Sequence, residues 1–189
     1  MEHLRQFFSD RYVDFPDADW DLIAQRFVRH EFPKKHTILR AGQVEEFVTF
    51  IEQGIVRYYI PKDYRQITFE ITFEGDFFGA YDSFLSRQPS LYSVETITPV
   101  VAWRLSYDAV QQLYRETAYG NLVGRLACEN LFLEKLKREL SFLTDTPEQR
   151  YLRLMTEHPQ MIRLIPQQFI AAYIGVTPQA LSRIRRRIF

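Results

Sequence analysis

The sequence is poor in the features that would fix a disulfide, a metal centre or a membrane anchor. Cys128 is the only cysteine in 189 residues, so one chain can hold neither an internal disulfide nor a cysteine-ligated zinc site or iron–sulfur cluster. No apolar run approaches the roughly 18 residues of a membrane-spanning helix. No apolar segment follows a basic start, as it would in a secretory signal. We therefore expect a cytoplasmic protein with no membrane association.

Residues that usually perform catalysis or bind metals are also scarce. The four histidines, His3, His30, His36 and His158, are scattered along the chain, whereas metal-dependent barrel enzymes cluster His and carboxylate ligands at short spacing. No Ser–His or Cys–His arrangement suggests a nucleophile. These absences argue against an enzyme such as a small barrel hydrolase or isomerase, and we predict no metal and no cofactor.

Acidic residues are missing from the end of the chain, although the formal net charge of the whole is zero. No Asp or Glu follows Glu157, whereas five arginines do: Arg163, Arg183, Arg185, Arg186 and Arg187. A basic segment in a neutral protein is the electrostatic footprint of a polyanion-binding site. The plain alternative is a solvated basic tail, so the surrounding pattern decides between them.

The segment Ile165–Phe189 has the pattern of two short helices joined by a sharp turn. Gly175 supplies the backbone freedom of the turn, Thr177 is a candidate N-cap, and Pro178 suits a first helical position. Apolar or small residues recur on one face of both helices and at the turn: Ile170, Ala171, Ile174, Val176, Leu181 and Ile184. This pattern predicts a helix-turn-helix.

The outward face of the second predicted helix carries side chains that suit DNA. Gln179 and Arg183 are predicted to contact base edges, because glutamine and arginine form paired hydrogen bonds with adenine and guanine. Ser182 and Arg186 are the next candidates on this face. Phosphate contacts, which position a protein without reading sequence, are predicted for Thr177, Arg185 and Arg187.

From about His30 the sequence changes to short strands with turns every roughly 8–12 residues, which is typical of a small barrel or sandwich. The clearest pair is a hairpin with arms Ile55–Ile60 and Gln66–Phe73 and a turn at Pro61–Tyr64. The second arm alternates with a period of two, which predicts one buried face made of Ile67, Phe69, Ile71 and Phe73.

A long helix is predicted over roughly Tyr119–Leu143. One face repeats at alternating spacings of four and three residues, the heptad pattern of a coiled coil. We call these positions the leucine seam: Leu122, Leu126, Glu129, Leu133, Leu136, Leu140 and Leu143. A second stripe, which is predicted to pack on the barrel, consists of Val123, Ala127 and Leu131. Two apolar stripes on one helix favour a homodimer over a helix packed wholly within its own chain.

A break in the helical pattern at Thr144–Pro147 separates the long helix from the end of the chain. Thr146 and Gln149 fit a capping box, with Pro147 at the first helical position of the next helix. We therefore predict three parts: a barrel with N-terminal helices over residues 1–118, a dimerisation helix over 119–143, and a DNA-binding domain over 144–189.

This order of elements resembles the Crp/Fnr family of bacterial transcription regulators. The resemblance rests on IPQQFIAAYIGVTPQALSRIRRRI, on the hinge Phe142–Thr146 and on the Gly-flanked stretch EGDFFGAYDSFL. It implies an α+β fold with an N-terminal double-stranded β-helix or jelly-roll barrel of the cyclic-nucleotide-binding type, a long dimerisation helix and a helix-turn-helix that ends before the family's wing. It also implies a homodimer on a near-palindromic site in double-stranded DNA, with RNA polymerase as a further candidate partner.

By the same resemblance, Gly75–Tyr92 corresponds to the phosphate-binding cassette of the barrel. The implied pocket residues are Phe77, Gly79, Ala80, Tyr81, Ser90 and Tyr92. Cassettes that hold cyclic AMP carry a glutamate for the ribose and an arginine for the phosphate. Here Ala80 replaces the glutamate, Ser90 stands near the arginine position, and Arg87 comes three residues early. A buried phosphate without a cation is costly, so cyclic AMP is not expected and the effector is unknown.

The predicted function is therefore that of a dimeric, sequence-specific transcription regulator whose barrel senses an unknown effector or serves as a scaffold. The alternative is a ligand-binding sensor module that has lost DNA binding. The two differ in what they expect of Arg183: in the alternative, its replacement has no consequence outside the protein.

Overall fold

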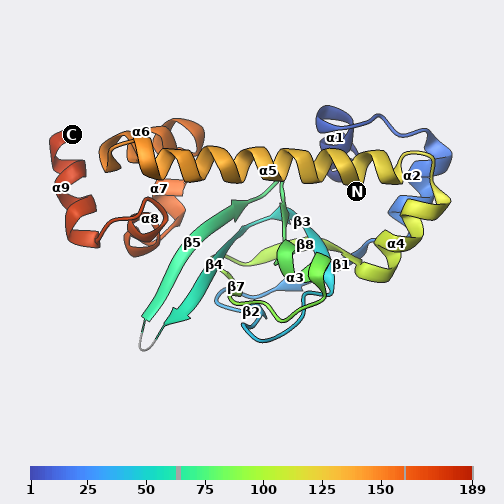
Figure 1. The fold of residues 1–189 in the computed structure, drawn as a ribbon, viewed down its shortest axis with the longest axis horizontal. Helices are drawn as coiled ribbons and strands as arrows, with labels where there is room; N and C mark the ends of the chain where they lie inside the picture. The colour runs from blue at the N-terminus through green and yellow to red at the C-terminus, as the bar shows by residue number, and fades with distance from the viewer. Residues whose placement is uncertain (63–64, 160, 189) are drawn as a thin grey trace.

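A computed structural model describes residues 1–62, 65–159 and 161–188 of the chain. In Figure 1 a β-sandwich lies against one long helix, α5 (Gly120–Thr144), and shorter helices gather at the two ends of the molecule. Helices α1 (Glu2–Arg11), α2 (Asp17–Ala24) and α4 (Tyr107–Glu116) lie at one end. The other end holds α6 (Pro147–Glu157), α7 (Met161–Leu164), α8 (Gln167–Tyr173) and α9 (Pro178–Ile188).

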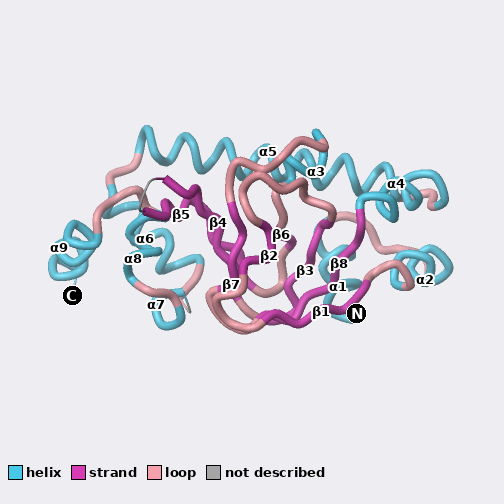
Figure 2. The backbone as a smooth tube through the Cα atoms, turned by 90° about the horizontal axis from the view of Figure 1, so that it is seen from below, coloured by secondary structure: helices cyan, strands magenta, loops and turns pink. Residues whose placement is uncertain are grey.

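The strands, which are magenta in Figure 2, form a sandwich. It consists of two four-stranded sheets whose paired strands run antiparallel. One sheet has the order β1-β8-β3-β6, with bounds Val28–Phe32, Val100–Ser106, Phe47–Gln53 and Phe77–Phe78. The other has the order β2-β7-β4-β5, with bounds Thr37–Leu39, Ser93–Thr96, Ile55–Lys62 and Arg65–Phe73. The chain is thus an α+β protein built on a sandwich, as the sequence predicts.

Apolar side chains from both sheets meet between them and form the sandwich core. Ile51, Val56, Val94 and Ala102 are wholly buried there. A second core, rich in aromatic rings, joins α1, α2 and α4 to the outer face of the first sheet through Phe7, Trp20 and Phe50, among others. Together these cores fix the N-terminal helices on the sandwich.

Local signals in the sequence place several helix ends correctly. Ser106 caps α4, because its hydroxyl accepts a hydrogen bond from the Ala109 amide at 3.2 Å. Both hydrogen bonds of the predicted capping box between Thr146 and Gln149 are present at the start of α6. Helix α3 (Tyr81–Ser86), a short helix inside the cassette-like stretch, is not among the elements predicted from the sequence.

The predicted burial of the second hairpin arm is wrong towards its tip. Ile71 and Phe73 are buried as expected, but Ile67 is 44% exposed and Thr68 only 1%. The cause is a bulge: Tyr58 pairs with Glu70 and Tyr59 with Thr68, so Phe69 is an extra residue that inverts the alternation. Of the predicted turn at Pro61–Tyr64, residues 63–64 lie outside the described residues.

Candidate effector cavity and nucleic-acid interface

Helices α8 and α9 are joined by a tight turn and share a buried face. Ile170, Ala171, Ile174, Leu181 and Ile184 are each at most 6% exposed, and Val176 is half-buried. Gly175 adopts a positive φ of 77°, which a residue with a side chain rarely adopts. The Thr177 hydroxyl accepts a hydrogen bond from the Ala180 amide at 3.2 Å and so caps α9.

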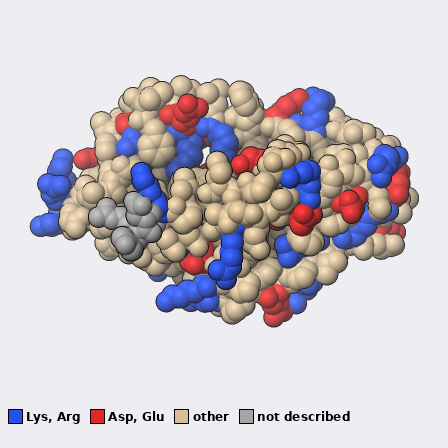
Figure 3. Space-filling view, turned by 60° about the horizontal axis from the view of Figure 1, so that its bottom comes forward, with Lys and Arg blue, Asp and Glu red and all other residues tan. Residues whose placement is uncertain are grey.

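The opposite face of α9 carries the polar side chains for which DNA contact is predicted. Gln179, Arg183 and Arg186 are exposed, and Ser182 is half-buried between them. These positions follow the spacing i, i+3, i+4 and i+7 of one helical face. The remaining candidates for phosphate contact are exposed or half-buried: Thr177, Arg185 and Arg187. Basic side chains gather at the end of the molecule where α9 lies (Figure 3).

Helix α5 contains no buried residue along its 25 residues. On the leucine seam, Leu133, Leu136, Leu140 and Leu143 are 39–77% exposed, and the neighbouring Phe132 is 65% exposed. The remaining seam members lie nearer the start of the helix: Leu122 and Leu126 are half-buried, and Glu129 is exposed and pairs with Arg125 at 2.7 Å. An exposed apolar stripe of this kind usually marks an interaction surface.

The second stripe of α5 faces the sandwich across a large cavity. Val123, Ala127 and Leu131 are half-buried and line this cavity, whose volume is about 1080 Å³. Four of the predicted pocket residues, Phe77, Gly79, Tyr81 and Tyr92, also line it, whereas Ala80 and Ser90 do not. Ala80 and Ser90 are buried at 0% and 2% exposure, behind the cavity wall.

Glu45 links the start of β3 to the buried residue Ala80 through hydrogen bonds with backbone amides. Its carboxylate accepts hydrogen bonds from the amides of Phe47 at 3.1 Å and Ala80 at 3.2 Å. Burial raises the pKa of Glu45, against the lowering effect of these amides. Nothing in the sequence marks Glu45 as a functional residue, because an acidic pair in a loop gives no signal of burial.

The arginine nearest to the expected phosphate position does not line the cavity. Arg87 donates hydrogen bonds to the Glu45 carbonyl at 2.8 Å and to the Glu46 carboxylate at 2.5 Å. Its guanidinium also lies 4.2 Å from the ring centre of Tyr107. These contacts commit Arg87 to the loop before β3.

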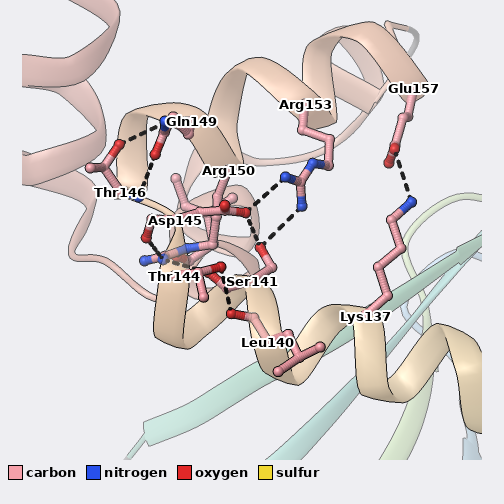
Figure 4. A network of polar contacts seen from close by, with 11 residues as sticks. Lys137, Leu140, Ser141, Thr144, Asp145, Thr146, Gln149, Arg150, Arg153 and Glu157 are labelled. Atoms are coloured by element: carbon pink, nitrogen blue, oxygen red, sulfur yellow. Dashed lines mark hydrogen bonds and ion pairs between the residues drawn. The ribbon is translucent and has the colours of Figure 1, made fainter.

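The hinge between α5 and α6 is held by a compact polar network (Figure 4). The Asp145 carboxylate accepts a hydrogen bond from the Ser141 hydroxyl at 2.7 Å and pairs with Arg153 at 2.8 Å. The hydrogen bond from Ser141 and the charge of Arg153 together lower the pKa of Asp145. Arg150 donates to the carbonyls of Asp145 and Ile174 at 2.6 and 2.9 Å, which ties the hinge to the end of α8.

The C-terminal helices pack on strands β4 and β5 of their own sandwich, and their apolar side chains share one core. The Phe73 and His158 rings stack with centroids 4.7 Å apart. Arg138 of α5 donates to the carbonyls of Phe69 at 2.5 Å and Tyr173 at 3.0 Å. Arg138 also lines the cavity, so one guanidinium touches the cavity, the hairpin and α8.

Within residues 1–62, 65–159 and 161–188, no three His, Cys, Asp or Glu side chains lie close enough to hold a metal ion. Nor does any helix in this part of the chain combine the length and apolarity needed to cross a bilayer.

Comparisons with known proteins show which family model and which folds this chain is similar to. Residues 29–117 match the family model of the cyclic nucleotide-binding domain. None of the curated proteins compared with the chain matches it.

Among solved structures, FixK2 from Bradyrhizobium japonicum is similar at a TM-score of 0.70 and 16% identity, over 86% of this chain and 84% of that one. A Crp/Fnr-family transcriptional regulator from Eubacterium rectale reaches 0.69 and 16%, over 93% and 84%. The c-di-GMP-responsive regulator CLP from Xanthomonas campestris reaches 0.66 and 15%, over 92% and 91%.

The chain therefore contains a cyclic nucleotide-binding domain fold and has, over most of its length, the fold of Crp/Fnr regulators. The resemblance that the sequence motifs indicate is confirmed.

Proposed function

We propose that this chain is a dimeric, sequence-specific DNA-binding regulator of transcription, with α8 and α9 as its helix-turn-helix. The observation that carries the proposal is the two-sided character of α9. One side is buried through Leu181 and Ile184, while the other presents Gln179, Arg183 and Arg186 to solvent. A helix in this state can enter a major groove without losing its packing.

The exposed part of the leucine seam supports the dimer. Burial of one leucine side chain contributes roughly 1.5–3 kcal/mol gross, so several leucines from each chain can offset an association cost of ~4–15 kcal/mol. If two copies of α5 pair in parallel, both copies of α9 lie at the same end of the dimer, because α9 follows the C-terminal end of α5 (Figure 1). That arrangement suits two half-sites about one helical turn of DNA apart.

In this proposal the parts have separate roles. Residues 1–118 sense an effector or act as a scaffold, residues 119–143 dimerise, and residues 144–189 bind DNA. Gln179 and Arg183 read bases, with Ser182 and Arg186 beside them, whereas Thr177, Arg185 and Arg187 meet phosphate. Two proteins with similar folds are named as a global regulator and a transcriptional regulator, and these names support a role in the regulation of transcription.

DNA binding is tested by fluorescence anisotropy with a mixed-sequence duplex over a range of salt concentrations. The logarithm of the binding constant should fall linearly with the logarithm of salt, with a slope of about 0.9 per neutralised phosphate. The Arg185→Ala, Arg187→Ala double variant should reduce that slope by about 2. Arg40→Ala, an exposed arginine of the barrel, is the control. Absence of binding at the lowest salt would favour a sensor module without DNA binding.

A further inference from the structure

One part of the cavity between α5 and the sandwich is lined by aromatic rings that lie beside the Asp82 carboxylate. The rings of Tyr58, Phe69 and Tyr92 form a triangle with centroids 5.1–6.0 Å apart, and all three residues line the cavity. The Tyr92 hydroxyl donates a hydrogen bond to the Asp82 carboxylate, which places that charge beside the rings. Aromatic rings next to a carboxylate form the usual environment for an organic cation.

The lysine and arginine side chains that line the cavity already form ion pairs or hydrogen bonds with other groups of the protein. Arg11 pairs with Asp76, Lys135 with Glu70 at 2.5 Å, and Lys137 with Glu157 at 3.6 Å. Arg138 and Arg150 donate to backbone carbonyls, and Arg153 pairs with Asp145. An anionic ligand would therefore have to displace an existing partner, at the cost of leaving that partner unpaired.

The carboxylates of the lining show the opposite balance. Among the described residues, Glu74, Asp82 and Glu134 line the cavity with no ion pair to a lysine or arginine. Glu74 accepts a hydrogen bond from the Gly54 amide at 3.5 Å, and Asp82 accepts one from Tyr92. Burial and the neighbouring Asp76 raise the pKa of Glu134, and this effect outweighs the lowering by the nearby charges of Arg11 and Lys135.

We propose that this cavity binds an organic cation, an ammonium group on an apolar body, whose charge lies among Tyr58, Phe69, Tyr92 and Asp82. Glu134 contributes a second negative charge from the α5 side of the cavity. Burial raises the pKa values of the Tyr58 and Tyr92 phenols, so both rings stay neutral and can face a cation. Its role as the effector of a regulator rests on the proposed function, whereas the binding itself does not.

The cavity volume and its lining fit a ligand with a substantial apolar part. The cavity volume of about 1080 Å³ lies just above the range of small-molecule sites, roughly 300–1,000 Å³. Beside the aromatic triangle and the charged side chains, part of the wall is apolar, with Val123, Ala127 and Leu131 on α5 and Phe77 on the sandwich. A purely hydrophilic ammonium ion would leave this surface without a partner.

Binding is tested by isothermal titration calorimetry on the full chain with three probes of one shape. Phenyltrimethylammonium carries the cation, tert-butylbenzene is its neutral isostere, and phenylphosphonate carries an anion of similar size. The ammonium should bind about 3- to 30-fold more tightly than the neutral isostere, as a desolvated cation–aromatic contact does. The phosphonate should bind more weakly than both.

Charge-neutral variants locate the site. Asp82→Asn and Glu134→Gln should each weaken the ammonium about fivefold and leave tert-butylbenzene unchanged. Asp21→Asn, an exposed residue outside the lining, is the matched control and should change neither probe.

The proposal is overturned if the ammonium binds no better than its neutral isostere, if the phosphonate binds best, or if both cavity variants behave like Asp21→Asn. None of these measurements requires DNA. A chain that does not bind DNA would therefore contradict the proposed function without affecting the proposed cation site. A cavity that does not prefer the ammonium would contradict the cation site without affecting the proposed function.

Discussion

The guanidinium of Arg57, on strand β4, lies 4.2 Å from the ring centre of Phe169 on α8. On its other side it lies 4.4 Å from the Tyr59 ring, and its hydrogen bonds to Glu95 and Thr68 fix its plane. Arg57 is only 2% exposed. A buried side chain of strand β4 is therefore also a contact for α8, the first helix of the predicted helix-turn-helix.

Removal of the Phe169 ring should loosen the C-terminal helices from the sandwich. A cation–aromatic contact contributes about 0.5–2 kcal/mol, so Phe169→Ala should speed hydrogen exchange of the α8 and α9 amides while the β-strand amides keep their protection. The exposed neighbour Gln168→Ala is the control. Equal exchange in both variants would show that the contact contributes nothing to the docking.

Arg138 should couple the hairpin to α8. Arg138→Met removes the donors that serve the Phe69 and Tyr173 carbonyls, at a cost of about 1–3 kcal/mol in the free energy of unfolding. Both hydrogen bonds come from one nitrogen, Nη2, whereas the guanidinium plane also lies over the Phe142 and Tyr173 rings. Arg138→Lys keeps the charge but loses this plane, so it should rescue only part of the loss. Urea unfolding measures both. If lysine restored the full free energy of unfolding, the contribution of Arg138 would come from its charge and not from the geometry of its contacts.

The charged hinge predicts a specific dependence on acid. The pKa of Asp145 is lowered in the folded chain, so its contribution to stability is present above about pH 4, the unfolded value, and is lost as the pH falls through the folded pKa. Asp145→Asn should remove this contribution. Thermal unfolding at a series of pH values should show the two proteins converging in acid. A difference that stays constant with pH would contradict the assignment.

The leucine seam predicts the oligomeric state. Replacement of Leu133 and Leu136 by glutamate puts charges at the centre of the proposed interface and should give monomers that no longer bind DNA specifically. Val28→Glu places the same charge on an exposed apolar residue of β1, 56% exposed, and should leave the dimer intact. Light scattering distinguishes the two outcomes. A double variant that is still a dimer would show that another surface dimerises.

Base reading and phosphate contact should separate within α9. Arg183→Ala should weaken binding to the best site by ~1–3 kcal/mol and relax the preference at one base pair. Arg187→Ala should weaken binding to all sequences alike, because Arg187 is predicted to contact phosphate. Competition assays with single-base variants of the site measure both. A uniform loss for Arg183→Ala would make it a phosphate contact as well.

Much of this architecture could be predicted from local signals in the sequence, whereas the long-range packing could not. The cap at Ser106, the capping box at Thr146 and the turn at Gly175 depend on neighbours within a few residues, and all three are present. The Arg57–Phe169 contact joins residues more than a hundred positions apart. The hydrogen bonds of Arg138 to the Phe69 and Tyr173 carbonyls likewise form only when α8 is packed on the sandwich. No periodicity in the sequence encodes either one.

In the candidate site the same division holds. The outward side chains of α9 follow from helical periodicity. The bulge where β5 pairs with Tyr58 and Tyr59 does not: it inverts the alternation of side chains along β5, so that Thr68 is buried in place of Ile67. The charge balance of the cavity could not be predicted either, because its cations come from α1, α5 and α6 and find partners only once those helices are packed.

The most direct test of a sequence-specific dimer is selection of duplexes from a random DNA library with the purified protein. We predict enrichment of a near-palindrome whose half-sites lie about one helical turn apart, and its loss when Gln179→Ala and Arg183→Ala are combined. If the intact protein and this double variant recover the same unenriched pool, α9 does not read DNA and the proposed function is wrong.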